Sequence, residues 1–136
     1  MPPLLCPRSW RPDRAGIGDR KIAMNWGIVE VEPEVQNWLL GLTDEEFGHV
    51  VFYIDLLQDQ GVHLDEPYTR QLRGKLRELR FRLGREQRRI SYYIGRGRRI
   101  VLLTVFRKTK MREIEEVARA ATAMRRCIAE GHTVEE

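Results

Sequence analysis

Residues 76–106 read LRELRFRLGREQRRISYYIGRGRRIVLLTVF, and apolar residues recur at every second position in much of this stretch. In its first eight residues Leu79, Phe81 and Leu83 occupy alternate positions, with Arg80 and Arg82 between them. A strand turns successive side chains to opposite faces, so this alternation predicts a strand with one apolar and one cationic face. The stretch therefore combines part of a sheet core with a dense row of positive charge.

The remainder of the stretch predicts two more strands of the same sheet. Between residues 88 and 94, Ile90, Tyr92 and Ile94 share one face of the expected strand. Arg89, Ser91 and Tyr93 lie on the opposite face. The segment IVLLTVF, residues 100–106, is apolar on both faces, as is typical of a central strand. GREQ and GRG separate the three segments, and such short turns join antiparallel neighbours. The sequence predicts an antiparallel meander.

The flanking segments predict one further strand and three helices. Residues 26–32, WGIVEVE, alternate like a strand. Residues 33–60 have apolar side chains at helical spacing, and Thr43 followed by Glu46 is typical of a capping box that starts a second helix. A last amphipathic helix is expected over residues 114–128. The expected order is β-α-α-β-β-β-α, an α+β fold with a small, mainly antiparallel sheet, helices on one face and the cationic face open.

Charge is strongly segregated along the 136 residues, although the formal net charge is only +4. Residues 25–69 hold ten acidic and no basic side chains, whereas residues 70–110 hold fifteen basic and two acidic ones. Clustered Lys and Arg gain affinity for polyanions by releasing counterions from phosphates, so the basic segment predicts a nucleic-acid partner. The competing interpretation is a solvated face that keeps the sheet from pairing edge to edge.

The length fits one domain, which we expect over residues 25–132. Residues 1–24 lack apolar periodicity, and we expect a disordered tail or an extension from a wrongly assigned start codon, while residues 133–136 are expected to form a flexible tail. Cys6 and Cys127 lie near opposite ends of the chain, so neither a metal site nor a disulfide framework is expected. No apolar run approaches the roughly 18 residues that cross a bilayer, which predicts a cytoplasmic protein without a membrane partner.

The cationic face holds side chain types that can act together on an RNA phosphate. Arginine stabilises charge that grows on phosphorus, lysine beside several arginines can transfer a proton because its pKa is lowered, and tyrosine can stack on a base. Only Glu78 and Glu86 supply carboxylates in the basic segment, so we expect no metal and no cofactor. The candidates on this face are Arg80, Arg82, Arg89, Tyr93, Lys108 and Lys110.

Three motifs mark the chain between Trp26 and about His132, namely G-x-L-x-E-L-R, R-I-x-Y and L-L-x-x-F-x-K. They lie in segments such as YIDLLQDQGVHLDEPYTRQLRGKLRELR and RRIVLLTVFRKTKMREIEEVARA. At these spacings the chain resembles the RelE/ParE superfamily of bacterial toxins, and most closely its phage-derived HigB-like branch. The resemblance implies a RelE-like fold and the toxin of a type II toxin–antitoxin system, a metal-independent endoribonuclease that cleaves messenger RNA in the ribosomal A site. It also implies a helix-turn-helix, HigA-like antitoxin as partner, beside the ribosome and mRNA.

The resemblance also implies roles for individual residues. The arginine of E-L-R, the arginine before I-x-Y and the lysine after the last strand are the expected catalytic positions, which fall on Arg80, Arg89 and Lys108. Many relatives have paired lysines and a proline there, whereas this chain has Arg107 before Lys108 and no proline, so Lys110 is an alternative. RNA-binding roles are expected for Arg82, Tyr93, Arg98, Arg99 and Lys110. Two alternative functions remain, a non-catalytic ParE-like gyrase inhibitor and an inactive homologue that only binds its antitoxin.

Overall fold

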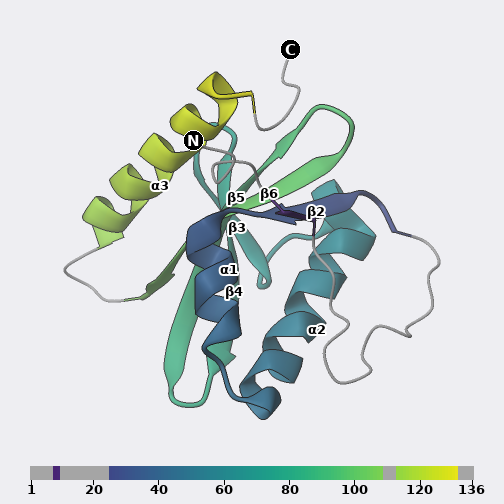
Figure 1. Cartoon of the computed structure of the whole chain (residues 1–136), viewed down its shortest axis with the longest axis vertical. Coiled ribbons are helices and arrows are strands. Elements are labelled where there is room, and N and C mark those ends of the chain that lie inside the picture. The colour runs from purple at the N-terminus through teal and green to yellow at the C-terminus, as the bar shows by residue number, and fades with distance from the viewer. Residues whose placement is uncertain (1–7, 10–24, 109–112, 132–136) are drawn as a thin grey trace.

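One mixed sheet with helices on both faces organises the chain (Figure 1). A computed structural model describes residues 8–9, 25–108 and 113–131. The six strands lie in the order β1-β2-β6-β5-β4-β3. In chain order the elements are β1 (Arg8–Ser9), β2 (Ile28–Val31), α1 (Pro33–Leu40), α2 (Asp44–Gln60), the 3-10 turn η3 (Gly61–His63), β3 (Thr69–Arg73), β4 (Leu76–Leu83), β5 (Glu86–Gly95), β6 (Arg99–Arg107) and α3 (Glu113–Ala129).

The predicted meander is confirmed, because β4, β5 and β6 pair antiparallel in consecutive order. Gly84 and Gly97 lie in its two turns with φ values of 66° and 76°, a backbone region that glycine enters without a clash of Cβ. β6 lies inside the sheet between β5 and β2, and β2 pairs with it in parallel. This central position agrees with the apolar residues on both faces of β6.

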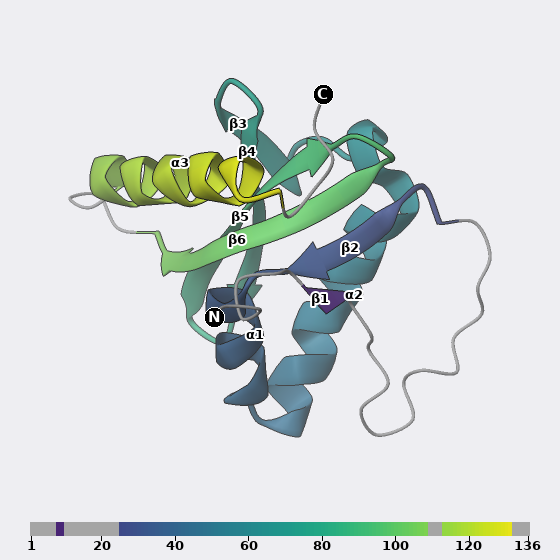
Figure 2. The same ribbon diagram turned by 45° about the horizontal axis from the view of Figure 1, so that its top comes forward.

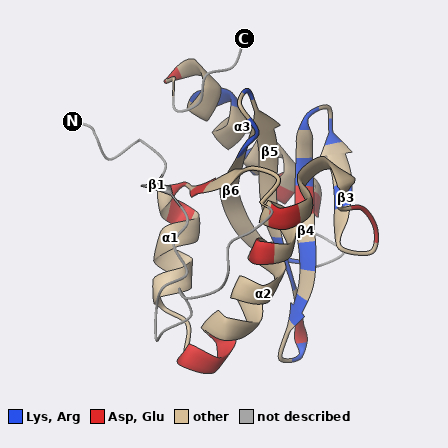
Figure 3. Ribbon diagram, turned by 90° about the vertical axis from the view of Figure 1, so that its right-hand side faces the viewer, with Lys and Arg blue, Asp and Glu red and all other residues tan. Residues whose placement is uncertain are grey.

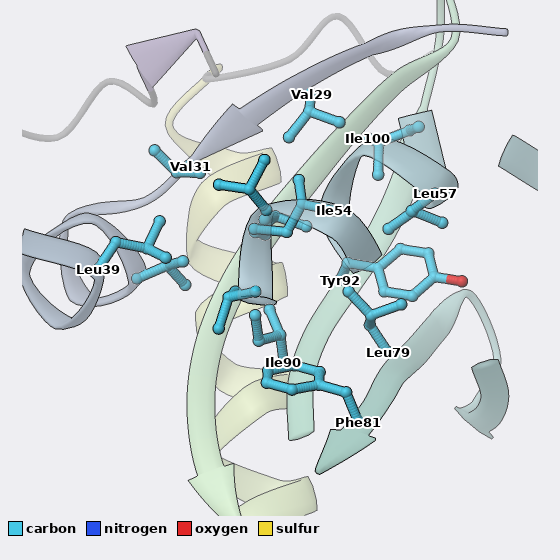
Figure 4. Packing of buried hydrophobic residues seen from close by; sticks show 14 of the residues in the cluster. Val29, Val31, Leu39, Ile54, Leu57, Leu79, Phe81, Ile90, Tyr92 and Ile100 are labelled. Atoms are coloured by element: carbon cyan, nitrogen blue, oxygen red, sulfur yellow. The ribbon is translucent and has the colours of Figure 1, made fainter. Parts of the chain in front are cut away.

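The two faces of the sheet have separate covers (Figure 2). α1 and α2 pack on the face that carries Leu79 and Ile90, and this forms the larger core (Figure 4). α3 packs on the opposite face, where Ala121 lies in the same cluster as Tyr93 and Val101. The expectation that the helices cover only one face is therefore wrong. Because β6 is apolar on both faces, the second face also needs a cover, and α3 provides it.

The cationic face stays open only beyond the part that α3 covers. Leu76, the first residue of β4, is fully buried in the cluster under α3. Farther along the same face of β4, Arg80 is half-buried and Arg82 is exposed. The open surface is therefore smaller than strand alternation alone predicts, and it lies at one end of the meander.

Local signals in the sequence set the ends of the first two helices. Pro33 occupies the first turn of α1, where its missing N–H would have no partner inside the helix. The predicted capping box of α2 is confirmed, since Thr43 Oγ1 accepts from the N–H of Glu46 at 3.1 Å and Glu46 Oε1 accepts from the N–H of Thr43 at 3.0 Å. α2 ends before Gly61, which has a φ of 51°.

β3 is a strand that the sequence pattern did not predict. It pairs antiparallel with β4 and lies at the edge of the sheet. Only Thr69 is buried and Leu72 partly buried, so no apolar alternation marks the segment. The tail expected at 133–136 lies outside the described residues, and so does the extension expected at 1–24, apart from β1, which pairs with β2.

Candidate functional site

Two rows of side chains cross the open end of the cationic face. In the first row, Arg80 of β4 lies directly opposite Arg89 of β5. In the second, Arg82 lies opposite Gln87, and the backbone N–H of Lys108 donates to the carbonyl of Gln87 at 3.0 Å. Neighbouring strands are about 4.8 Å apart, so long side chains in these rows can reach a common ligand. Lys and Arg are concentrated on β4 and its surroundings, while Asp and Glu mark the ends of α2 (Figure 3).

A buried carboxylate lies between the two arginines of the first row. Glu78 is 1% exposed, and its Oε2 lies 3.4 Å from Nε of Arg89 and 3.6 Å from Nε of Arg80. Arg89 is itself only 4% exposed. Either buried charge would be strongly unfavourable alone, so carboxylate and guanidinium stabilise each other as a pair. The Glu78 carboxylate is therefore the shared ion-pair partner of both guanidinium groups.

The ionisation of this network follows from burial and from the charges packed against it. Burial raises the pKa of the Glu78 carboxyl, and the positive charges of Arg89 and Arg80 oppose that rise. Burial likewise lowers the pKa of Arg89, while attraction to Glu78 opposes the decrease. Arginine ordinarily stays protonated up to about pH 12, so Arg89 keeps its charge at neutral pH. The negative charge of Glu113, at the start of α3, acts on both partners.

An open depression of about 220 Å³ lies over the arginine rows, and it is lined by Pro67, Arg80, Phe81, Arg82, Gln87 and Arg89. Three of the six residues carry a guanidinium group, which binds phosphate oxygens through two parallel N–H groups. Fixed cations of this kind also stabilise negative charge that develops during a reaction. The depression can therefore bind a phosphate diester and favour nucleophilic attack on it.

Lys108 is bonded through its backbone to Gln87, which lines this depression. It is exposed, it follows β6 directly, and its backbone bond to Gln87 aligns it with the second row. The geometry thus brings Arg80, Arg89 and Lys108 to the same end of the sheet. Lys110, the alternative for proton transfer, lies outside the described residues.

The structure contradicts the stacking role expected for Tyr93. This side chain is fully buried, and its hydroxyl donates to Sγ of Cys127 in α3 at 3.3 Å. Alternation along β5 did place Tyr93 on the same face as Arg89, but α3 covers that part of the face. A nucleotide base cannot reach the ring, so Tyr93 is a core residue.

Arg98 and Arg99 lie at the other end of the β5–β6 hairpin. The guanidinium of Arg98 lies 4.9 Å from the ring centre of Trp26 and donates to the Trp26 carbonyl at 3.1 Å, and Arg99 forms an ion pair with Glu30. At about 3.3 Å per residue, this turn is roughly 20 Å along the strand from Arg89. The fold does not bring these two arginines to the depression, and their expected contact with RNA stays a prediction.

Sequence reasoning missed the structural role of Glu78 and the participation of Pro67. In the sequence Glu78 counts only as one of two carboxylates in the basic segment, yet it lies two residues before Arg80 and therefore on the same strand face. That parity was a usable signal, because a lone carboxylate among many cations tends to pair with them. Pro67 had no comparable signal, since it reaches the depression only because the segment before β3 runs beside β4.

Two searches of the described residues concern metal and membrane binding. Within residues 8–9, 25–108 and 113–131, no group of three or more His, Cys, Asp or Glu side chains is arranged to hold a metal ion. None of the helices in this part of the chain is both long enough and apolar enough to span a bilayer.

Comparison with known protein families identifies one family that matches the chain. The family described as "Phage derived protein Gp49-like (DUF891)" matches residues 37–126, about two thirds of the sequence. The chain belongs to the Gp49-like family. This family is a RelE- and HigB-like family of toxins from toxin–antitoxin systems, and its toxins are generally ribonucleases. The region of this Gp49-like protein that matches contains every residue lining the depression, and membership implies an antitoxin as partner. No curated protein matches the chain at a significant level.

Proposed function

We propose that this Gp49-like protein is a toxin that cleaves messenger RNA on the ribosome. The observation that carries the proposal is the pair Arg80 and Arg89, held by the buried Glu78 beside an open depression. Such an arrangement fixes positive charge along the lining of an open depression, which suits a phosphate diester. Membership of a toxin family whose members are generally ribonucleases supports the same reading.

In the proposed reaction, the ribose 2′-oxygen attacks the adjoining phosphorus, and the bond from phosphorus to the 5′-oxygen breaks. Arg80 and Arg89 would bind the non-bridging oxygens and stabilise the negative charge that grows on them. Lys108, with Lys110 as the alternative, would accept the proton of the 2′-hydroxyl, and water would protonate the departing 5′-oxygen. The products would be a 2′,3′-cyclic phosphate and a 5′-hydroxyl end.

The proposed partners are the ribosome and a helix-turn-helix, HigA-like antitoxin. Fifteen basic residues between positions 70 and 110 would favour association with ribosomal RNA through release of counterions. Co-expression with the product of a neighbouring reading frame that encodes a small helix-turn-helix protein should abolish growth arrest and yield a complex that purifies intact.

Cleavage of a defined message with and without translating ribosomes tests the proposal. The wild-type chain should produce discrete 5′ ends within the A-site codon only when ribosomes are present. Arg89→Ala and Arg80→Ala should reduce the cleavage rate by about a hundredfold each, since one lost charge-stabilising donor is worth this much in other enzymes. Arg85→Ala, at an exposed position of the β4–β5 turn, is the matched control and should cleave normally.

Growth arrest while messenger RNA stays intact would contradict the ribonuclease proposal. In that case inhibition of gyrase, assayed as loss of DNA supercoiling, would be the next function to measure. Absence of both arrest and cleavage would instead identify an inactive homologue that binds only its antitoxin.

A further inference from the structure

The row of cations on the open face continues onto the edge strand β3, through Arg70. Arg70 pairs directly with Glu78 of β4, and residues that pair across two strands point to the same face of the sheet. Arg80 follows Glu78 by two residues, so it lies on this face as well, diagonal to Arg70. Diagonal neighbours of this kind are about 7 to 8 Å apart. Arg70 is therefore the next cation beside Arg80.

Arg70 lies where the cover of α3 ends. Leu72, two residues farther along β3, is partly buried in the cluster under α3, whereas Arg70 is exposed. The charge of Arg70 nevertheless acts on the buried pair of the site. It opposes the rise that burial gives the pKa of the Glu78 carboxyl, and it adds to the decrease that burial gives the pKa of Arg89. Arg70 thus combines exposure to solvent with proximity to the site.

The order of the strands arranges four cations in sequence across this face. β6, β5, β4 and β3 are successive neighbours in the sheet. They carry, in the same order, Lys108 directly after β6, then Arg89, Arg80 and Arg70. Three strand spacings of about 4.8 Å separate the outer two, which is roughly 14 Å. One phosphate cannot contact both ends of such a series, but successive phosphates of a strand that lies across the sheet can.

The proposed reaction gives this series a direction. In an in-line displacement the attacking and departing oxygens lie on opposite sides of phosphorus. Lys108 would take the proton of the attacking 2′-hydroxyl, so the departing nucleotide extends the other way, from Arg89 and Arg80 toward β3. The next anion along that direction is the phosphate on the 3′ side of the departing nucleotide. Arg70 is the next cation.

We infer that Arg70 binds the phosphate that follows the scissile one on the 3′ side. The inference rests on the proposed function, because it takes RNA as the ligand and Lys108 as the group on the side of the attacking oxygen. A guanidinium group suits a phosphate diester, and a contact to the backbone holds the strand in register whatever its bases are. This phosphate does not react. Arg70 therefore contributes to binding of the message and not to the rate of the bound complex.

Ribosomes programmed with synthetic messages that carry one uncharged methylphosphonate linkage test this inference. In the wild-type chain, a methylphosphonate directly 3′ of the cleaved linkage should raise the half-saturating toxin concentration about tenfold, the value of one charge-assisted hydrogen bond. Arg70→Ala should raise it by a similar factor with the unmodified message. The modified linkage should then cause no further loss in this variant. The cleavage rate at saturating toxin should stay unchanged in every case.

Two controls accompany this measurement. Arg73→Ala removes an exposed arginine from the other end of β3, where it pairs with Leu76, and should respond to both messages as the wild type does. A methylphosphonate on the 5′ side of the cleaved linkage should change the half-saturating concentration of the wild type and of Arg70→Ala by the same factor.

The outcomes separate this inference from the proposed function. Normal half-saturation by Arg70→Ala, or an undiminished response of this variant to the 3′ methylphosphonate, would overturn the inference while the ribonuclease stands. A lower rate at saturating toxin with unchanged half-saturation would overturn it too, because Arg70 would then act through Glu78 and Arg89. If the wild-type chain leaves every message intact, the proposed function fails and the inference fails with it.

Discussion

At the scale of single residues, the position of Glu78 determines how two arginines present their charge. Arg80 and Arg89 face each other across β4 and β5, where like charges directly opposite one another are destabilising. Glu78 relieves this repulsion because its carboxylate forms an ion pair with both guanidinium groups. The same residue is 1% exposed, so it supports the arginines without competing with a phosphate for the open surface.

Glu78→Gln should therefore impair both stability and cleavage. The variant keeps the size of the side chain but removes the charge that partners the buried Arg89, and loss of one partner of a buried pair costs about 3 to 5 kcal/mol. We expect a decrease of about this size in the free energy of unfolding, measured by urea denaturation. We also expect at least a tenfold lower cleavage rate under conditions where the variant is folded.

Glu86→Gln is the matched control for this variant. Glu86 lies on β5 and pairs with Arg88 and Arg107 at the surface. Exposed ion pairs contribute little, so both the urea midpoint and the cleavage rate should stay near the wild-type values. Equal effects of the two substitutions would show that position 78 has no special role.

Cys127 provides a second prediction at this scale. Burial raises the pKa of its thiol from 9.0 to about 12, and the side chain is 1% exposed. Above pH 9 the thiol ionises in the unfolded chain but not in the folded one, so the folded state should lose about 1.4 kcal/mol per pH unit through this group. Cys127→Ser lacks this ionisation. The stability of the wild-type chain relative to Cys127→Ser should therefore fall between pH 9 and 11, as measured by urea denaturation, and a constant difference would contradict the assignment.

At the scale of elements, the meander was predictable and the covers of the sheet were not. Alternation placed Arg80, Arg82 and Arg89 on one face of the strands, and the pairing of β4 with β5 agrees. The same alternation could not reveal that α3 covers part of that face, because helical periodicity marks an apolar stripe but not the surface on which it packs. The sequence pattern did not predict β3 for a different reason. An edge strand with mostly exposed residues has no apolar alternation to detect.

The end of α2 offers a test of how two elements meet. Gly61 has a φ of 51°, and a Cβ built there would lie 2.1 Å from the ring of Trp26. Gly61→Ala should therefore force Trp26 off the end of α2 and lower the free energy of unfolding by about 2 to 4 kcal/mol. Thermal denaturation measures this effect.

Gly48→Ala is the control within the same helix. A Cβ at Gly48 meets nothing within 4 Å, and alanine is the better helix former by about 1 kcal/mol. This variant should be as stable as the wild type or more stable. A loss of stability at Gly48 comparable to that at Gly61 would refute the close approach of Trp26 as the cause.

At the scale of the whole molecule, charge is distributed unequally. The acidic residues 25–69 contribute β2, α1 and α2, whereas the basic residues 70–110 contribute β4, β5, β6 and all of β3 but its first residue. This separation was visible in the sequence, but the depression was not, because it needs the segment before β3, β4 and β5 together. The basic surface is therefore wider than the depression, and long-range attraction acts over all of it.

Arg98→Gln should separate long-range attraction from catalysis. Arg98 lies at the far turn of the hairpin, away from the depression. If it contacts ribosomal phosphate, its loss should weaken ribosome binding and reduce the slope of log K against log salt by about one. The cleavage rate at saturating ribosomes should stay unchanged. Sedimentation at several salt concentrations measures the slope, and Glu45→Gln, in the first turn of α2, is the charge-changing control.

The parallel pairing of β2 with β6 has a consequence for the synthesis of the protein. It joins residues 28–31 to residues 99–102, so the centre of the sheet cannot form until the chain has been translated well past residue 102. Contacts between such distant segments are late events in folding. The cover supplied by α3 requires a still longer nascent chain. A nascent chain therefore lacks the assembled surface until residues 28–31, 99–102 and α3 have all been translated.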